Sequence, residues 1–184
     1  MTEREIFWAL LWGDEHSRHE VHLRQDGERV VCWIPCHHQG RLTRLLDSDE
    51  CFVSAVPRRR PDTLSWGPAH MLWSSLSKPE HCQRLERFQP APTLVWRDRR
   101  SSRRWAAWSL SRPLSPQFVQ QATERLAHHL GGLRRAASPE ALIASPFSGH
   151  WAVEFHTPET YTAREVVGQL RDAPDPHQWK AMAA

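Results

Sequence analysis

The run Met71–Ser77, M-L-W-S-S-L-S, constrains the fold of this chain more than any other stretch. It lies between Gly67-Pro68 and Pro79, residues that interrupt regular structure on both sides. An apolar run this short, bounded by turn signals, is typical of a buried β-strand. We therefore expect a sheet that contains this strand, with three serine hydroxyls near the end of the strand.

Short helices and short strands alternate along the chain. Two helix signals are the clearest: a capping box from Thr2 to Glu5, and an apolar stripe that follows Ser115-Pro116 and stops at Gly131-Gly132. This order indicates an α/β or α+β sheet with helices on its faces. Helices are expected at Thr2–Gly13, Arg41–Leu46, Pro79–Phe88, Pro116–Leu130 (apolar stripe Phe118, Val119, Ala122, Leu126, Leu130), Pro139–Ile143 and Thr162–Leu170, and strands at His19–Arg24, Arg29–Ile34, Cys51–Val56, Met71–Ser77, Thr93–Arg97, Arg104–Leu110 and Trp151–Phe155.

Length and composition are those of a globular protein outside the membrane. The 184 residues suffice for one domain or for two small modules that share an interface. No run reaches the roughly 18 apolar residues of a membrane helix, and the N-terminus lacks the pattern of a secretory signal. The four cysteines are too few and too unevenly spaced for a disulfide framework, so we expect them to be reduced. A cytoplasmic protein without membrane contact is expected.

The cationic residues are almost all arginines. The net charge is only +3, but Lys78 and Lys180 are the only lysines, and ten tryptophans accompany the arginines. The planar guanidinium group of arginine binds phosphate and stacks on rings in ways that lysine cannot. Arginine and tryptophan together favour a surface that holds nucleic acid, although a GC-rich genome also increases the arginine content.

One segment has the residue types of a zinc site. Cys32-x3-Cys36-His37-His38 places two thiols and two imidazoles close together in sequence. Its spacing is not that of the tight pairs in zinc-binding motifs, and Cys32 lies within an apolar strand. A core cysteine beside an exposed histidine pair explains the same residues. We expect no metal and no other cofactor.

Several segments, each weak alone, occur in a defined order: Val53–Arg59 (V-S-A-V-P-R-R), His70–Ser77 (H-M-L-W-S-S-L-S), Gln89–Val95 (Q-P-A-P-T-L-V), Arg100–Trp105 (R-S-S-R-R-W), Ala107–Leu110 (A-W-S-L), Leu130–Gly132 (L-G-G), Ala144–His150 (A-S-P-F-S-G-H) and Tyr161–Glu165. Together they resemble the primase-polymerase (prim-pol) branch of the archaeo-eukaryotic primase superfamily, which is common in plasmid and phage replication proteins. The resemblance spans most of the chain.

The resemblance implies an α+β fold in which an N-terminal αβ module packs on an RRM-like antiparallel sheet with flanking helices. It implies one primase-like domain over residues 1–174, with the first module at about 1–68 and the RRM-like part at 69–174. Residues 175–184 are expected to be a C-terminal tail.

The same resemblance implies that the catalytic motifs are degenerate. Ser75 and Ser77 stand where the family has its two metal-binding acids, and Trp105 stands where it has a nucleotide-binding histidine. The family has a Ser-Gly-x-Gly-x-His hairpin before this histidine, and Ser101 and Arg103 stand at its two glycine positions. Ala144 stands where the family has an arginine. Two-metal phosphoryl transfer needs anionic oxygens around Mg²⁺ or Mn²⁺, and serine hydroxyls are neutral. We therefore expect no catalytic residue at these positions.

The basic hairpin formed by residues 97–105 could still bind a nucleic-acid strand, since arginines contact phosphates and indoles stack on bases. The competing interpretation is a solvated hairpin whose tryptophans belong to the core. The candidate binding residues are Arg97, Arg99, Arg100, Arg103, Arg104 and Trp105, with Arg58, Arg59 and Arg60 as an extension of the surface.

The leading hypothesis is a non-catalytic, primase-like protein of plasmid or phage DNA replication. It would bind single-stranded or primed DNA, or a replication partner such as a helicase or an active primase. One alternative is an active primase-polymerase that takes its acids from elsewhere: Asp47, Asp49, Glu50, Asp98 or Glu154. The others are a protein–protein adaptor without nucleic-acid binding, and an unrelated α/β fold that matches by chance.

Overall fold

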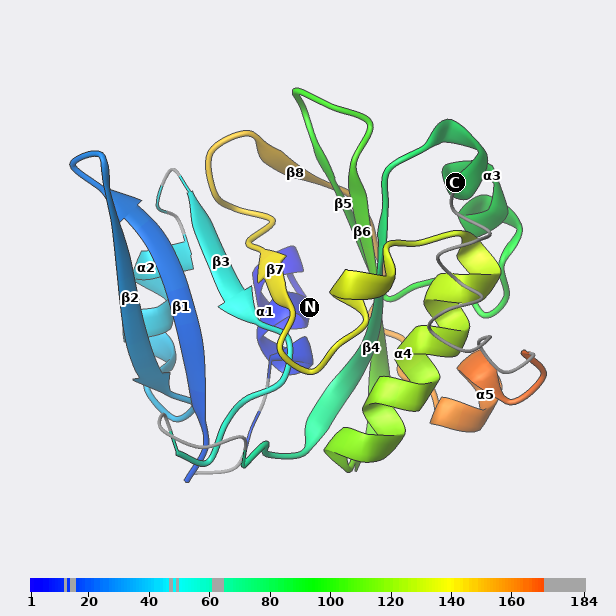
Figure 1. Ribbon diagram of the computed structural model, residues 1–184, viewed down its shortest axis with the longest axis horizontal. Coiled ribbons are helices and arrows are strands. Elements are labelled where there is room, and N and C mark those ends of the chain that lie inside the picture. The colour runs from blue at the N-terminus through cyan, green and yellow to red at the C-terminus, as the bar shows by residue number, and fades with distance from the viewer. Residues whose placement is uncertain (12, 14–15, 47, 49, 61–64, 171–184) are drawn as a thin grey trace.

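The chain forms two four-stranded antiparallel sheets with helices packed on them, and the expected α+β class is confirmed (Figure 1). The structure is a computed structural model that describes residues 1–170 except 12, 14–15, 47, 49 and 61–64. The expected tail at 175–184 lies outside the described residues. No helix in the described part of the chain is both long and apolar enough to cross a membrane.

The first sheet has the strand order β2-β1-β3-β7, and helix α2 packs on one of its faces. The β1–β2 hairpin turns at Asp26-Gly27, both with positive φ (52° and 86°), as the Asp-Gly signal predicts. The bounds are β1 (Arg18–Gln25), β2 (Glu28–Pro35), α2 (Gln39–Leu46), β3 (Cys51–Ser54) and β7 (Leu142–Ala144).

Strand β7 corrects one prediction. A helix was expected at Pro139–Ile143, but Leu142–Ala144 pairs with β3 instead. An apolar run this short fits a helix or a strand equally well, and the open edge of β3 decides between them. The first sheet is therefore completed by a segment from the C-terminal half of the chain.

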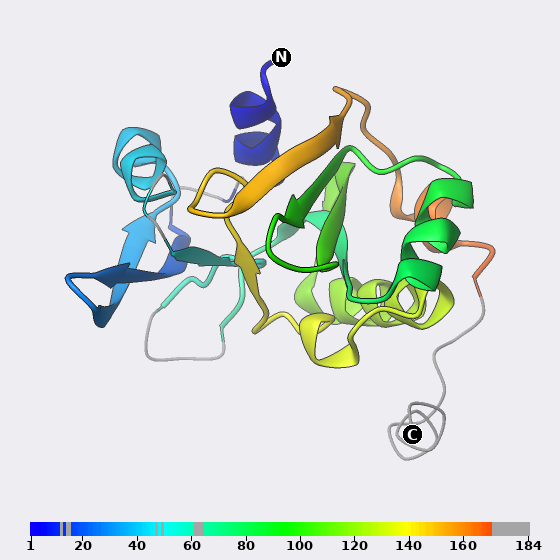
Figure 2. The same ribbon diagram turned by 90° about the horizontal axis from the view of Figure 1, so that it is seen from above.

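The second sheet has the order β4-β6-β5-β8 and carries helices on both faces. Helices α3, α4 and α5 lie on one side, and α1 lies on the other, between the two sheets (Figures 1 and 2). The bounds are α1 (Glu3–Leu10), β4 (Ala69–Leu76), α3 (Pro79–Arg87), β5 (Leu94–Asp98), β6 (Arg104–Leu114), α4 (Pro116–Leu130), the 3-10 helix η1 (Arg134–Ala136), β8 (Trp151–His156) and α5 (Ala163–Val167).

The two strongest helix signals are confirmed, with one exception. Thr2 and Glu5 form the capping box of α1, and α4 ends at Gly131 in the left-handed conformation (φ 77°). Val119 and the rest of the apolar stripe of α4 are buried, but Phe118 is 62% exposed. Phe118 directly precedes Val119, so it lies about 100° around the helix from that side chain.

Tryptophan side chains of the second sheet join it to the first. Trp96 and Trp73 belong to one buried cluster that also contains residues of the first sheet. The Trp96 Nε1–H donates to the carbonyl oxygen of Ala144 in β7 at 3.0 Å, and the Trp73 Nε1–H donates to the carbonyl of Ala136. The Phe7 ring of α1 packs edge-on against Trp96, with centroids 5.9 Å apart. These contacts hold both sheets and α1 together.

We expect Trp96→Ala to lower the free energy of unfolding by about 3–5 kcal/mol, since it leaves a cavity where the sheets meet. Trp96→Phe keeps a ring but leaves the Ala144 carbonyl unpaired, so we expect a loss of about 1–3 kcal/mol. Urea unfolding followed by far-UV circular dichroism measures both. The matched control is Phe118→Ala at an exposed position, where a change within about 0.5 kcal/mol is expected. Equal losses at positions 96 and 118 would contradict this account of the core.

Candidate functional site

The positions that match the family's catalytic residues lie on one face of the second sheet. Ser75 of β4 stands directly opposite Trp105 of β6 in the strand register. Residues two apart in a strand share a face, so Ser75 lies on the same face as Trp73, toward the first sheet. Ser77 follows on that face, just beyond the end of β4. The matched residues are therefore neighbours, as the resemblance implies.

This face is filled by aromatic side chains. Ser75 is 1% exposed and Trp105 is 5% exposed. The Trp105 ring stacks on Trp96, with centroids 6.2 Å apart and an interplanar angle of 13°. The Trp105 Nε1–H is buried without a hydrogen-bond partner among the described residues. Ser75 therefore lies in an apolar core rather than in a cleft open to a charged ligand.

The donor chemistry at these positions does not suit the divalent metals used in this fold family. Ser75 offers a buried neutral hydroxyl, and Trp105 offers an N–H donor, which repels a cation. Ser77 is partly exposed, and its carbonyl oxygen accepts a 2.8 Å hydrogen bond from the Ser102 hydroxyl. Within the described residues, no group of three or more His, Cys, Asp or Glu side chains could hold a metal.

Asp98 shapes the turn between β5 and β6. Its carboxylate accepts hydrogen bonds from the Arg100 backbone N–H at 2.9 Å and from the Ser101 hydroxyl at 2.7 Å. His150 Nε2 lies 3.4 Å from the same carboxylate. Burial raises the pKa of Asp98, but these hydrogen bonds and the neighbouring positive charges outweigh it, so the pKa is lowered. Asp98 is therefore an ionised turn-forming residue whose oxygens are already engaged.

Glu154 holds two of the candidate arginines on the opposite face of the sheet. It pairs with Arg104 at 2.6 Å and with Arg97 at 3.1 Å. Side chains alternate along a strand, so Arg97 and Arg104 point away from the face of Trp96 and Trp105. The sequence groups Arg97, Arg104 and Trp105 in one binding surface, but the two arginines lie on the face opposite the buried Trp105 ring.

The hairpin tip keeps the accessible arginines. Arg99 and Arg100 are exposed and Arg103 is partly exposed. Among the described residues, the structure shows no ion pair for these three side chains. The hairpin extends beyond the body of the molecule (Figure 1). These three guanidinium groups can therefore contact phosphate.

Arg58 has a structural role in the first module. It pairs with Glu20 at 3.2 Å, and its guanidinium lies over the rings of Trp66 (4.4 Å) and Trp33 (5.3 Å). Its side chain is only 17% exposed. The cation–π contacts and the ion pair leave this arginine poorly placed for a phosphate.

Arg58, Arg59 and Arg60 do not extend the hairpin surface. Arg58 bridges to Trp66, just before β4 begins, whereas the hairpin lies where β4 ends. An eight-residue strand such as β4 spans roughly 26 Å, so the two basic groups lie at opposite ends of it. Arg59 and Arg60, which follow Arg58 in the chain, are exposed.

The zinc candidates do not form a site. Cys36 is buried and Cys32 is partly buried, while His37 and His38 are exposed with their rings 4.3 Å apart. Burial raises the pKa of the Cys32 thiol, which keeps it protonated. This is the arrangement of a core cysteine beside an exposed histidine pair.

Of the acids considered for an alternative active site, the three that the structure describes do not converge. Asp47 and Asp49 lie outside the described residues. Glu50 directly precedes β3 of the first sheet and pairs with Arg24 at 3.6 Å. Asp98 and Glu154 are engaged on opposite faces of the second sheet, as described above. His150 beside Asp98 was not predicted, because nothing in the sequence links it to the hairpin.

The described chain has the fold of the archaeo-eukaryotic primase-like, primase-polymerase class. The AEP domain of the primase-polymerase of cyanophage S-2L matches with a TM-score of 0.66 and 11% identity, over 92% of this chain and 97% of that chain. The catalytic domain of primase RepB′, in a structure with initiator DNA, matches with a TM-score of 0.57 and 13% identity, over 98% and 93%. Another RepB′ chain matches with a TM-score of 0.58 and 14% identity, over 98% of this chain and 62% of that longer chain. Neither a protein-family model nor a curated protein sequence matches the chain.

We expect Ser75→Asp to lower the free energy of unfolding at pH 7 by about 3 kcal/mol or more, because it buries a carboxylate without a counter-charge. Burial raises the folded-state pKa of such an acid above its unfolded value of about 3.9. The destabilisation is therefore full above the folded pKa and diminishes as the pH falls through it. Urea unfolding at pH 7 and pH 5 measures this difference. Ser77→Asp, at a partly exposed position, is the control and is expected to cost less than about 1 kcal/mol. A Ser75→Asp protein that is as stable as the native protein at pH 7 would show that position 75 is open to water.

Proposed function

We propose that this chain is a primase-like protein without nucleotidyl transfer that binds a nucleic-acid strand during replication of plasmid or phage DNA. The observation that carries the proposal is the pairing of buried Ser75 with buried Trp105 at the positions of the family's catalytic residues. This pairing removes both the anionic metal ligands and the open space that a nucleoside triphosphate needs.

The fold favours a nucleic-acid partner. Primase RepB′, which shares the fold, has been solved in complex with initiator DNA. In this chain the β5–β6 hairpin presents Arg99, Arg100 and Arg103. Asp98 lies near these arginines, but the described residues show no ion pair with their side chains. Single-stranded or primed DNA would contact these guanidinium groups through its phosphates, and the affinity would fall steeply with salt.

The alternative of an active enzyme with displaced acids has less support. Glu154 is neutralised by Arg97 and Arg104, and Asp98 is engaged by Arg100 and Ser101. A metal pair would have to break these interactions and would still lack a second nearby carboxylate from the part of the chain that the structure describes. A protein–protein adaptor, or a role beside a helicase or an active primase, would not need the exposed arginines of the hairpin tip.

We expect no nucleotide incorporation and no primer synthesis by this chain, with Mg²⁺ or Mn²⁺, because no group of three or more His, Cys, Asp or Glu side chains among its described residues could hold the metals. Incorporation of labelled dNTPs on a primed template, and of labelled NTPs on an unprimed one, measures this, with an active primase-polymerase as the positive control. Incorporation that is lost in Asp98→Asn or Glu154→Gln would instead establish the displaced-acid enzyme.

We expect the native chain to bind a single-stranded oligonucleotide with an affinity that falls with salt. Replacing Arg99, Arg100 and Arg103 together by alanine should reduce the slope of log K against log[salt] by about 2, since each phosphate that the protein no longer neutralises lowers the slope by about 0.7. Fluorescence anisotropy over a range of salt concentrations gives the slope.

The control for this experiment removes the same charge elsewhere. Arg44, Arg87 and Arg112 lie on α2, α3 and β6, away from the hairpin tip, and all three are exposed. Their combined replacement by alanine should leave the slope nearly unchanged. If both triple variants lower the slope equally, binding depends on net charge and the hairpin is not the site. If the native chain does not bind at all, the adaptor alternative gains support.

A further inference from the structure

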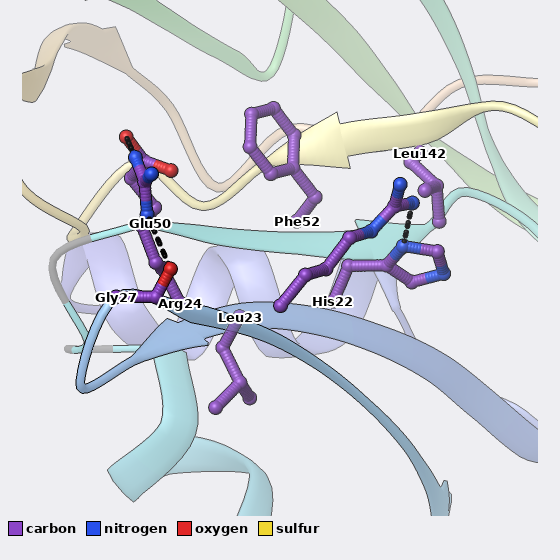
Figure 3. A pocket seen from close by; sticks show the side chains of 8 residues that line it. His22, Leu23, Arg24, Gly27, Glu50, Phe52 and Leu142 are labelled. Atoms are coloured by element: carbon purple, nitrogen blue, oxygen red, sulfur yellow. Dashed lines mark hydrogen bonds and ion pairs between the residues drawn. The ribbon is translucent and has the colours of Figure 1, made fainter.

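The first sheet carries a pocket on the face opposite α2. It has a volume of about 520 Å³, within the range of roughly 300–1,000 Å³ that is usual for small-molecule sites. Its lining combines basic and apolar side chains from β1, β2, β3 and β7 (Figure 3). Leu23, which alternates with these side chains on β1, points to the other side, toward the buried core (Figure 3).

Phe52 stands in this pocket between two arginines. It lies opposite His22 in the register of β1 and β3, and it is only partly buried. Arg24 lies on one side of the ring, and His22, which Arg29 contacts, lies on the other (Figure 3). An accessible aromatic ring flanked by guanidinium groups suits a flat heterocycle that carries phosphate.

Arg29 is held in place by a defined histidine tautomer. Its Nη2 lies 2.5 Å from His22 Nδ1, and a guanidinium can only donate, so Nδ1 is the acceptor. His22 Nε2 therefore carries the proton and donates to Glu20 at 2.6 Å. Since Glu20 also pairs with Arg58, this chain of contacts fixes Arg29 beside the pocket without neutralising it directly.

Arg24 is held only loosely. Its ion pair with Glu50 is 3.6 Å long, and the two side chains are 60% and 44% exposed. An exposed pair of this kind contributes little to stability. A phosphate group can therefore take the place of the Glu50 carboxylate at little cost.

We propose that this pocket binds a nucleotide, with the base stacked on Phe52 and its phosphates on Arg24 and Arg29. The nucleotide is a unit of a single strand or a free mononucleotide, which share this chemistry. The β1–β2 turn and the β5–β6 hairpin point to the same end of the molecule (Figure 1), so one strand could contact both. The inference does not rest on the hairpin site, because the pocket belongs to the other sheet.

The first test measures binding of fluorescein-labelled (dT)12 and, by calorimetry, of dTTP without metal. Phe52→Leu keeps an apolar side chain but removes the ring, so we expect about 5- to 150-fold weaker binding of whichever probe uses the pocket. Arg24→Ala/Arg29→Ala should also weaken binding and reduce the salt slope for (dT)12 by about 1.4. Phe118→Leu, at an exposed phenylalanine on α4, is the matched control and should bind normally.

Glu50→Gln gives a prediction of opposite sign. It removes the carboxylate that competes with phosphate for Arg24, so we expect about two- to fivefold tighter binding, the range of an exposed ion pair. A variant that merely perturbs the fold would weaken binding instead. Tighter binding would therefore support the pocket even if Phe52→Leu proves unstable.

Photo-crosslinking locates the base directly on the native chain. A (dT)12 that contains 5-iododeoxyuridine, or 5-iodo-dUTP as the free nucleotide, should crosslink to the peptide that contains Phe52. Crosslinks confined to the hairpin peptide, together with unchanged binding by Phe52→Leu, Arg24→Ala/Arg29→Ala and Glu50→Gln, would overturn the inference. The hairpin proposal would then stand alone. Loss of binding in the pocket variants with normal binding by the hairpin variant would show that the pocket binds the strand and the hairpin does not.

Discussion

The stacked pair of Trp96 and Trp105 is the interaction on which the rest of this structure depends. Trp96 ties the second sheet to β7 of the first through its Nε1–H, and Trp105 covers the position of Ser75. The same two rings therefore join the two sheets and fill the face of the second sheet on which Ser75 lies. The packing between the sheets and the apolar surroundings of Ser75 have one physical cause.

The fold does not depend on acidic residues at positions 75 and 77. The buried side chains of β4 and β6 pack in the core, and Ser75 is buried opposite Trp105 in the strand register. The remaining carboxylates near the site have structural partners: Asp98 forms the hairpin turn, and Glu154 fixes Arg97 and Arg104. Arg99 and Arg100 of the same hairpin remain exposed at the surface.

Signals from a few neighbouring residues predicted those strands and helix ends that depend only on neighbouring residues. The run Met71–Ser77 predicted β4, and Thr2 with Glu5 predicted the start of α1. The helix expected at Pro139–Ile143 was wrong, because only the edge of β3 makes that segment a strand. In the same way, no sequence pattern shows that Arg58 is enclosed by Trp33 and Trp66, which come from separate segments. A run of basic residues in the sequence therefore does not by itself establish a basic surface in the fold.

The residues at positions 75 and 105 are physically coupled. An aspartate at position 75 would face the buried Trp105 ring, whose surroundings can neither solvate nor neutralise it. A histidine at position 105 in turn would lose the stack on Trp96 and leave a polar ring in the core. Each present residue therefore makes an aspartate at position 75 or a histidine at position 105 unfavourable in this core. Introducing either one alone would cost stability.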